Sequence, residues 1–75
     1  MTRVRKRSVT IDRHRTSITL EDPFWEALKQ IATDRGEPLQ TLVADIDRTR
    51  EGPGDNLSGA LRVFVLRTLQ DKLKA

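Results

Sequence analysis

The sequence of 75 residues contains no cysteine and no hydrophobic run long enough to cross a bilayer. Without cysteine, no disulfide bond can stabilise the fold, and no thiolate can bind a metal or act as a nucleophile. The longest apolar run, residues 63–66, is far shorter than the roughly 20 residues that a membrane span needs. The basic N-terminus has no apolar segment of the kind found in signal peptides. We therefore expect one small cytoplasmic domain with no membrane partner.

The sequence also lacks the residue combinations of enzymes and metal sites. His14 is the only histidine, so a histidine-ligated metal site is not expected. Three serines that could act as nucleophiles, Ser8, Ser17 and Ser58, have no histidine–acid pair positioned beside them. The "GPG" at 52–54 does not match the spacing of a phosphate-binding P-loop. We expect no catalytic activity, no metal and no cofactor.

Positive charge is concentrated at the N-terminus. Residues 1–20 contain six basic residues and one acidic residue, a net charge of +5, whereas the remainder contains eight basic and ten acidic residues, a net charge of −2. Basic N-terminal segments usually bind a polyanion, and nucleic acid more often than a membrane. The alternative is a solvated tail without a partner.

The stretch "HRTSITL", residues 14–20, alternates with a period of two, which is typical of a β-strand. Its two sides are His14, Thr16, Ile18 and Leu20, and Arg15, Ser17 and Thr19. Residues 1–13 are predicted to form a basic arm. Within this arm "SVTI", residues 8–11, either extends the strand or turns back on it through Asp12 and Arg13. Asp-Arg is a weaker hairpin signal than Asp-Gly, so both arrangements stay open.

Helical periodicity predicts three helices after this strand, at 23–35, 38–50 and 56–73. Asp22 is expected to cap the first helix and Gly36 to end it. Pro38 opens the second helix, which "EGPGD" at 51–55 separates from the third. Asp55 or Asn56 is expected to cap that third helix.

A single strand leaves half of its backbone groups without partners. The simplest solution is a two-fold dimer in which each chain contributes one strand to an antiparallel ribbon. The expected fold is thus mainly α with one N-terminal strand, a core of this strand and two helices at 14–50, and an additional third helix. The expected dimer core consists of Thr16, Ile18, Leu20, Phe24, Leu28, Ile31, Leu39, Leu42, Val43, Ile46, Leu61, Phe64 and Val65.

Two longer stretches carry a family resemblance. "RTSITLEDPFWEALKQIATDRG" followed by "PLQTLVADI" resembles the ribbon-helix-helix family of bacterial DNA-binding regulators, the Arc and Met repressor type. "KRSVTIDRHRTSITLEDPFWEAL" with "NLSGALRVFVLRTL" is similar to a branch of short bacterial proteins that carry this domain. The first resemblance covers roughly residues 14–50 and the second nearly the whole chain. It implies a homodimeric transcriptional regulator or repressor that binds double-stranded DNA.

In that family the ribbon enters the major groove and its outward side chains contact base edges. The matching positions here are Arg15, Ser17 and Thr19. The alternative is an exposed polar strand face with no partner. The candidate phosphate contacts are Arg3, Arg5, Lys6, Arg7, Arg13, Leu39 and Gln40.

The resemblance implies a phosphate at the N-terminus of the second helix. Here Pro38 lacks an N–H group and Glu37 would repel phosphate. The "NLS" at 56–58 is the alternative anchor. The third helix, absent from the minimal family fold, is expected to pack on the core. Joining dimers into a tetramer, or binding another protein through 56–73, are its alternatives. The competing function is therefore a dimerisation module that binds a protein partner and associates with DNA only non-specifically.

Overall fold

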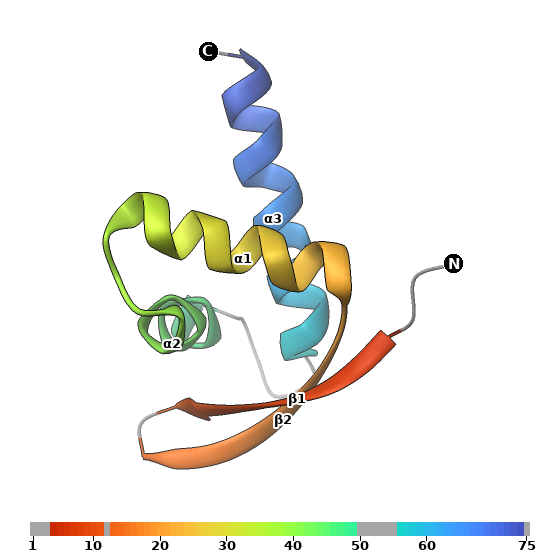
Figure 1. The fold of residues 1–75 in the computed structure, drawn as a ribbon, viewed down its shortest axis with the longest axis vertical. Helices are drawn as coiled ribbons and strands as arrows, with labels where there is room; N and C mark the ends of the chain where they lie inside the picture. Colours follow the sequence, from red (N-terminus) through yellow and green to blue (C-terminus); the bar gives the residue numbers. More distant parts are fainter. Residues whose placement is uncertain (1–3, 12, 50–55, 75) are drawn as a thin grey trace.

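The computed structural model describes residues 4–11, 13–49 and 56–74 of the chain. Its elements are β1 (Val4–Ile11), β2 (His14–Glu21), α1 (Asp22–Arg35), α2 (Leu39–Thr49) and α3 (Leu57–Lys74). The two strands lie together on one side of the molecule, and the three helices lie on the other (Figure 1). One face of the ribbon is therefore left uncovered by the helices.

The strands form an antiparallel hairpin in which Ser8 lies opposite Ser17. Arg13, in the two-residue connection between them, has a φ of 71°, the left-handed conformation that tight hairpin turns require. The prediction of a single N-terminal strand is thus wrong, because β1 of the same chain pairs along β2. Pairing of the ribbon with a second chain stays a prediction. Residues 4–7, predicted as part of an arm, belong to β1 together with 8–11. Because the connection between the two strands is short, bringing them together costs the chain little conformational entropy.

Local chemistry explains where the helices begin and end. Asp22 is the first helical residue of α1 rather than its cap, and Pro23 follows in the first turn. Gly36 ends α1 with a φ of 69°, and its N–H group donates to the Thr33 carbonyl at 3.0 Å. The Pro38 carbonyl accepts the first hydrogen bonds of α2 from the N–H groups of Thr41 and Leu42.

The cap of α3 is Asn56. Its Oδ1 accepts a hydrogen bond from the Ser58 N–H group at 2.9 Å, which satisfies one of the free donors at the helix N-terminus. Several sequence-based predictions fall on residues outside the described part: the phosphate contact Arg3, the turn residue Asp12, the helix end at residue 50, the break at 51–55 and the alternative cap Asp55.

The hydrophobic core lies within a single chain. It is formed by Val9, Ile11, Ile18, Leu20, Leu28, Ile31, Ala32, Leu42, Val43, Ala44, Ile46, Leu61 and Val65. Phe24, Leu39 and Phe64 are partly buried against it, and Thr16 is half-buried. The residues predicted for a dimer core are therefore mostly buried without a second chain, because β1 contributes Val9 and Ile11 to the sheet face that the helices cover.

Candidate nucleic-acid interface

The hairpin register assigns each strand residue to one of two faces. Residues directly opposite each other in an antiparallel pair point to the same side. Because Ile18 and Leu20 are buried against the helices, their neighbours in the alternation, Ser17 and Thr19, point outward. Both are exposed.

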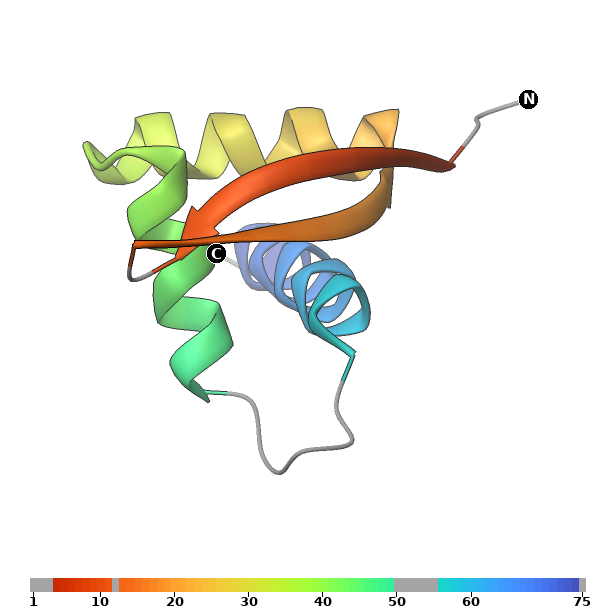
Figure 2. The same ribbon diagram turned by 90° about the horizontal axis from the view of Figure 1, so that it is seen from below.

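The outer face of the hairpin thus combines residues from both strands. It consists of the cross-strand pairs Lys6–Thr19, Ser8–Ser17 and Thr10–Arg15. Thr10 is half-buried and the other five residues are exposed. Viewed from below, the hairpin lies in front of the helices, which leave this face open (Figure 2). The predicted base contacts, Arg15, Ser17 and Thr19, occupy one strand of this face.

The outer face and its turn have unpaired positive charge. Within the described residues, Lys6, Arg13 and Arg15 form no ion pair. Lysine and arginine side chains that are free in this way attract phosphate. Between them the face presents serine and threonine hydroxyl groups, which can donate to or accept from base edges.

Arg5 and Arg7 point to the other side of β1, toward Asp22 at the start of α1. Arg7 forms a hydrogen-bonded ion pair with Asp22, and its guanidinium lies 4.8 Å from the centre of the Trp25 ring. Only 17% of the Arg7 side chain is exposed. Arg5 Nε lies 3.4 Å from Asp22 Oδ1, but 65% of its side chain is exposed. Of these two predicted phosphate contacts, Arg7 is engaged within the protein and Arg5 stays largely accessible.

The predicted phosphate contacts Arg13 and Gln40 line one surface hollow. Thr10, Thr41, Ala44 and Arg48 complete its lining. The hollow therefore joins the hairpin turn to the N-terminal half of α2, beside the outer face. Leu39 is half-buried, so a phosphate contact of Leu39 would be made through its backbone.

At Thr19, α3 contacts the edge of β2 that does not pair with β1. The Thr19 N–H group donates to Ser58 Oγ at 3.1 Å, and Arg62 Nη2 donates to the Thr19 carbonyl at 3.3 Å. Arg62 Nε also donates to Glu21 Oε1 at 2.9 Å. The pKa of Glu21 is lowered by a backbone hydrogen bond of Glu21 itself and by the bond from Arg62. Nothing in the sequence pattern indicated these long-range contacts, although "NLS" did mark Ser58 as lying at a helix start.

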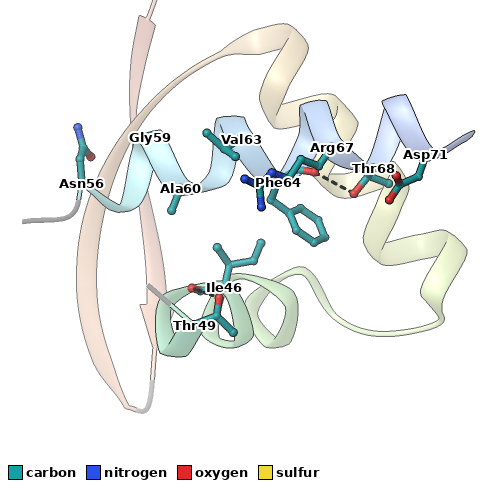
Figure 3. Close-up of a pocket in the computed structure, with 10 residues that line it drawn as sticks. All are labelled: Ile46, Thr49, Asn56, Gly59, Ala60, Val63, Phe64, Arg67, Thr68 and Asp71. Carbon is teal, nitrogen blue, oxygen red and sulfur yellow. Dashed lines mark hydrogen bonds between the residues drawn. The ribbon is translucent and has the colours of Figure 1, made fainter. Parts of the chain in front are cut away.

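A second surface feature lies between α2 and α3. Figure 3 shows a groove with Ile46 and Phe64 facing each other, and with Arg67 and Asp71 on its rim. Along α3, further apolar side chains are exposed to solvent. They are Val63, Leu66, Leu69 and Leu73. This apolar surface is the feature that a protein partner would contact.

The comparison with family models shows the family of this chain. A ribbon-helix-helix domain model matches residues 4–69, a range that includes both strands, α1, α2 and most of α3. The chain belongs to the ribbon-helix-helix domain family. No curated protein and no solved structure gives a significant match. The match extends beyond residues 14–50 in both directions, and it includes β1 and residues 57–69 of α3.

Domains of this family typically bind DNA, regulate transcription and form dimers, and they are generally not enzymes. The described part of the chain contains no cluster of three or more histidine or acidic residues that could hold a metal. Among the described helices, none is long and apolar enough to span a membrane.

Proposed function

We propose that this protein is a sequence-specific DNA-binding regulator of transcription, acting as a repressor, that inserts its β-ribbon into the major groove. The observation that carries the proposal is the outer face of the hairpin, which is exposed, basic and rich in hydroxyl groups. The major groove admits a two-stranded ribbon. Ribbon readers are an established docking class.

Each outward residue of β2 is suited to a different contact with the bases. Arg15 can donate two hydrogen bonds to guanine O6 and N7, and Ser17 and Thr19 offer hydroxyl groups to neighbouring base edges. The Thr19 methyl group can also contact the methyl group of thymine. These side chains supply the sequence preference.

The phosphate contacts of the proposal are Lys6, Arg13 and Arg5, with Gln40 and the backbone of Leu39 at the start of α2. They supply affinity and salt dependence rather than sequence choice. Arg7 is left out because its guanidinium is bound to Asp22 and stacked on Trp25. The proposal includes a homodimer, in line with the typical behaviour of the family.

The test is binding of the pure protein to fragments of its source genome at two salt concentrations. We expect selection of particular fragments that persists at the higher salt. Arg15→Ala is expected to cost about 1–3 kcal/mol of binding and to relax the preference. Arg35→Ala is the matched control, because it removes the same charge from an exposed position at the end of α1. Equal binding by the Arg15→Ala and Arg35→Ala variants would contradict the proposal.

The exposed apolar residues of α3 favour a second candidate function, that of a module for binding another protein. In that case the basic ribbon would act only as a polyanion tether. The same experiment separates the two candidates. A tether gives uniform, weak binding to all fragments that disappears as salt rises, whereas a reader keeps its selected fragments.

A further inference from the structure

We infer that Ser58 and Arg62 of α3 are positioning residues for DNA recognition. They hold the backbone of Thr19, so that the Thr19 side chain meets the bases in one defined place. The inference rests on the proposed function and deepens it, because it gives two residues outside the ribbon a part in the sequence preference. It also gives α3 a role in recognition beside its packing on the core.

The first support is a pair of hydrogen bonds at Thr19, which we call the Thr19 clamp. Ser58 Oγ accepts a hydrogen bond from the Thr19 N–H group at 3.1 Å, and Arg62 Nη2 donates to the Thr19 carbonyl at 3.3 Å. Residues four positions apart lie on the same face of a helix. One face of α3 therefore binds both backbone groups of the same strand residue.

The second support is that the two side chains of the clamp are themselves held in place. Ser58 is only 5% exposed, and its N–H group donates to Asn56 Oδ1 at the start of α3. Arg62 Nε donates to Glu21 Oε1 at 2.9 Å. Buried hydroxyl groups are normally hydrogen-bonded, and leaving one without a partner is unfavourable. The Ser58 hydroxyl would lose its bond to Thr19 if it turned away.

The third support is the direction of the Thr19 side chain. Ile18 is 2% exposed and Leu20 is fully buried, so the core holds both neighbours of Thr19. Because adjacent residues of a strand point to opposite faces, the Thr19 side chain points out of the ribbon. The core thus sets the direction of this side chain, and the clamp sets the position of its backbone.

Threonine depends on backbone position more than arginine does. A hydrogen bond to a base edge needs a donor and an acceptor about 2.7–3.2 Å apart. The threonine hydroxyl is one rotatable bond from the backbone, so a shift of the backbone moves the hydroxyl with it. Arg15 reaches its base through a long, flexible stem and can compensate for such a shift. Loss of the clamp should therefore affect the contact of Thr19 and spare that of Arg15.

The clamp is confined to one end of β2. Among the described residues, no hydrogen bond from α3 reaches the backbone of Arg15 or Ser17. The edge of β2 at these two residues is left to the strand of a second chain in the proposed homodimer.

The test measures affinity for single base-pair variants of a fragment that the wild-type protein selects. Thr19→Val removes the hydroxyl and keeps the shape of the side chain, so it identifies the base pair that Thr19 reads. At that base pair the wild-type preference is expected to be about fivefold or more, and Ser58→Ala and Arg62→Ala should reduce it to less than about twofold. The preference that Arg15→Ala removes should remain in both variants.

Two further variants of α3 are matched controls. Thr68→Val removes a hydroxyl that bonds only the Phe64 carbonyl of the same helix, and Arg67→Ala removes an exposed arginine. Both should keep the wild-type preference at every base pair. A purely structural role of Ser58 would weaken binding to all fragments alike and leave the preferences unchanged. Circular dichroism establishes which variants are folded, and Arg62→Ala provides the test where Ser58→Ala is not.

A second measurement tests the clamp without DNA. Amide hydrogen exchange followed by NMR should show a protected Thr19 N–H group in the wild-type protein. In Ser58→Ala, Thr19 should exchange about tenfold or more faster relative to Ile18 of the same strand, whereas Thr68→Val should leave this ratio unchanged. The ratio removes the effect of a general loss of stability. An equal ratio in wild type and Ser58→Ala would overturn the inference.

The outcomes with DNA separate the inference from the proposed function. Loss of the Thr19 preference in Ser58→Ala and Arg62→Ala, with the Arg15 preference kept, supports both. Wild-type preferences in these two variants, with selection lost in Arg15→Ala, would overturn the inference and leave the function standing. Thr19→Val with wild-type preferences would also overturn the inference, because there would be no Thr19 contact to position. Unchanged selection by Arg15→Ala would overturn both.

Discussion

At the scale of single residues, neighbouring basic side chains of β1 have different roles. Lys6 points outward and forms no ion pair within the described residues, whereas Arg7 points inward to Asp22 and Trp25. Composition alone treats both as phosphate contacts. The strand period of two separates them, because adjacent residues of a strand point to opposite faces.

Arg7 and Arg5 allow a matched test of this difference, since both contact Asp22. Arg7→Ala is expected to lower the free energy of unfolding by about 2 kcal/mol, because it removes the packing of a mostly buried arginine, a cation–π contact and an ion pair to a half-exposed carboxylate. Arg5→Ala removes only an exposed pair and should cost less than about 0.5 kcal/mol. Urea unfolding followed by circular dichroism measures both values. Equal effects of the two variants would contradict the assignment of Arg7 to the fold.

At this scale, the sequence correctly predicted residues whose role depends only on their neighbours in the chain, such as the ends of helices. Gly36 was expected to end the first helix, and its left-handed φ confirms this. Asn56, one of two expected caps, is confirmed as the cap of α3. The Ser58 and Arg62 bonds to β2 could not be predicted, because they join residues about 40 positions apart and follow no periodic pattern.

At the scale of elements, β2 was visible in the sequence, whereas only residues 8–11 of β1 showed an alternating pattern. The alternation at 14–20 has apolar residues on one side, whereas the N-terminal half of β1 carries Arg5, Lys6 and Arg7 in a row. A run of charge hides the period of two, because both faces look polar there. The weak turn signal of Asp12-Arg13 then favoured a second chain as the partner. The short connection favours the hairpin that forms.

The attachment of α3 to the rest of the domain is expected to depend on pH. The pKa of Glu21 is lowered below its ordinary value of 4.5, first by its own backbone hydrogen bond and then by Arg62. The pKa of Asp34 is lowered below 3.8, first by the Gln30 side chain and then by Lys72 of α3. A lowered acid pKa contributes stability in full above the unfolded value, and this contribution is lost as pH falls through the folded value.

We therefore expect the thermal midpoint to be steady above about pH 4.5 and to fall as the solution is acidified below it. Glu21→Gln should reduce this pH dependence, because the glutamine cannot titrate. Glu26→Gln, at an exposed position on α1, is the control and should leave it unchanged. Circular dichroism melts at several pH values give the result. An identical acid response in wild type and Glu21→Gln would show that the contact between Glu21 and Arg62 does not contribute.

At the scale of the whole molecule, the chain itself contains a second strand, which the sequence analysis expected from a partner chain. β1 pairs along one edge of β2, α3 bonds the Thr19 backbone at the other edge, and Val9 and Ile11 of β1 are buried in the core. The expectation of a second strand was sound in principle, because an unpaired strand is not stable. Within the chain that strand is β1, in the hairpin that was the less favoured of two open alternatives.

The whole-molecule arrangement also separates two surfaces. The outer face of the ribbon points away from the helices, and α3 extends away from the ribbon toward the C-terminus (Figure 1). Leu66, Leu69 and Leu73, in the C-terminal half of α3, are exposed. DNA contact through the ribbon would leave the apolar residues of α3 free for a second copy or another protein.

The central claim is that the outer face of the hairpin contacts DNA, and NMR titration of isotope-labelled protein with a selected DNA fragment tests it most directly. The largest backbone amide shifts are expected at 6, 8 and 10 of β1 and at 15, 17 and 19 of β2, with smaller shifts at Arg13 and Gln40. An unselected fragment of equal length is the control and should give weaker, salt-sensitive shifts. Shifts concentrated on α3, with the ribbon amides unchanged, would contradict the account.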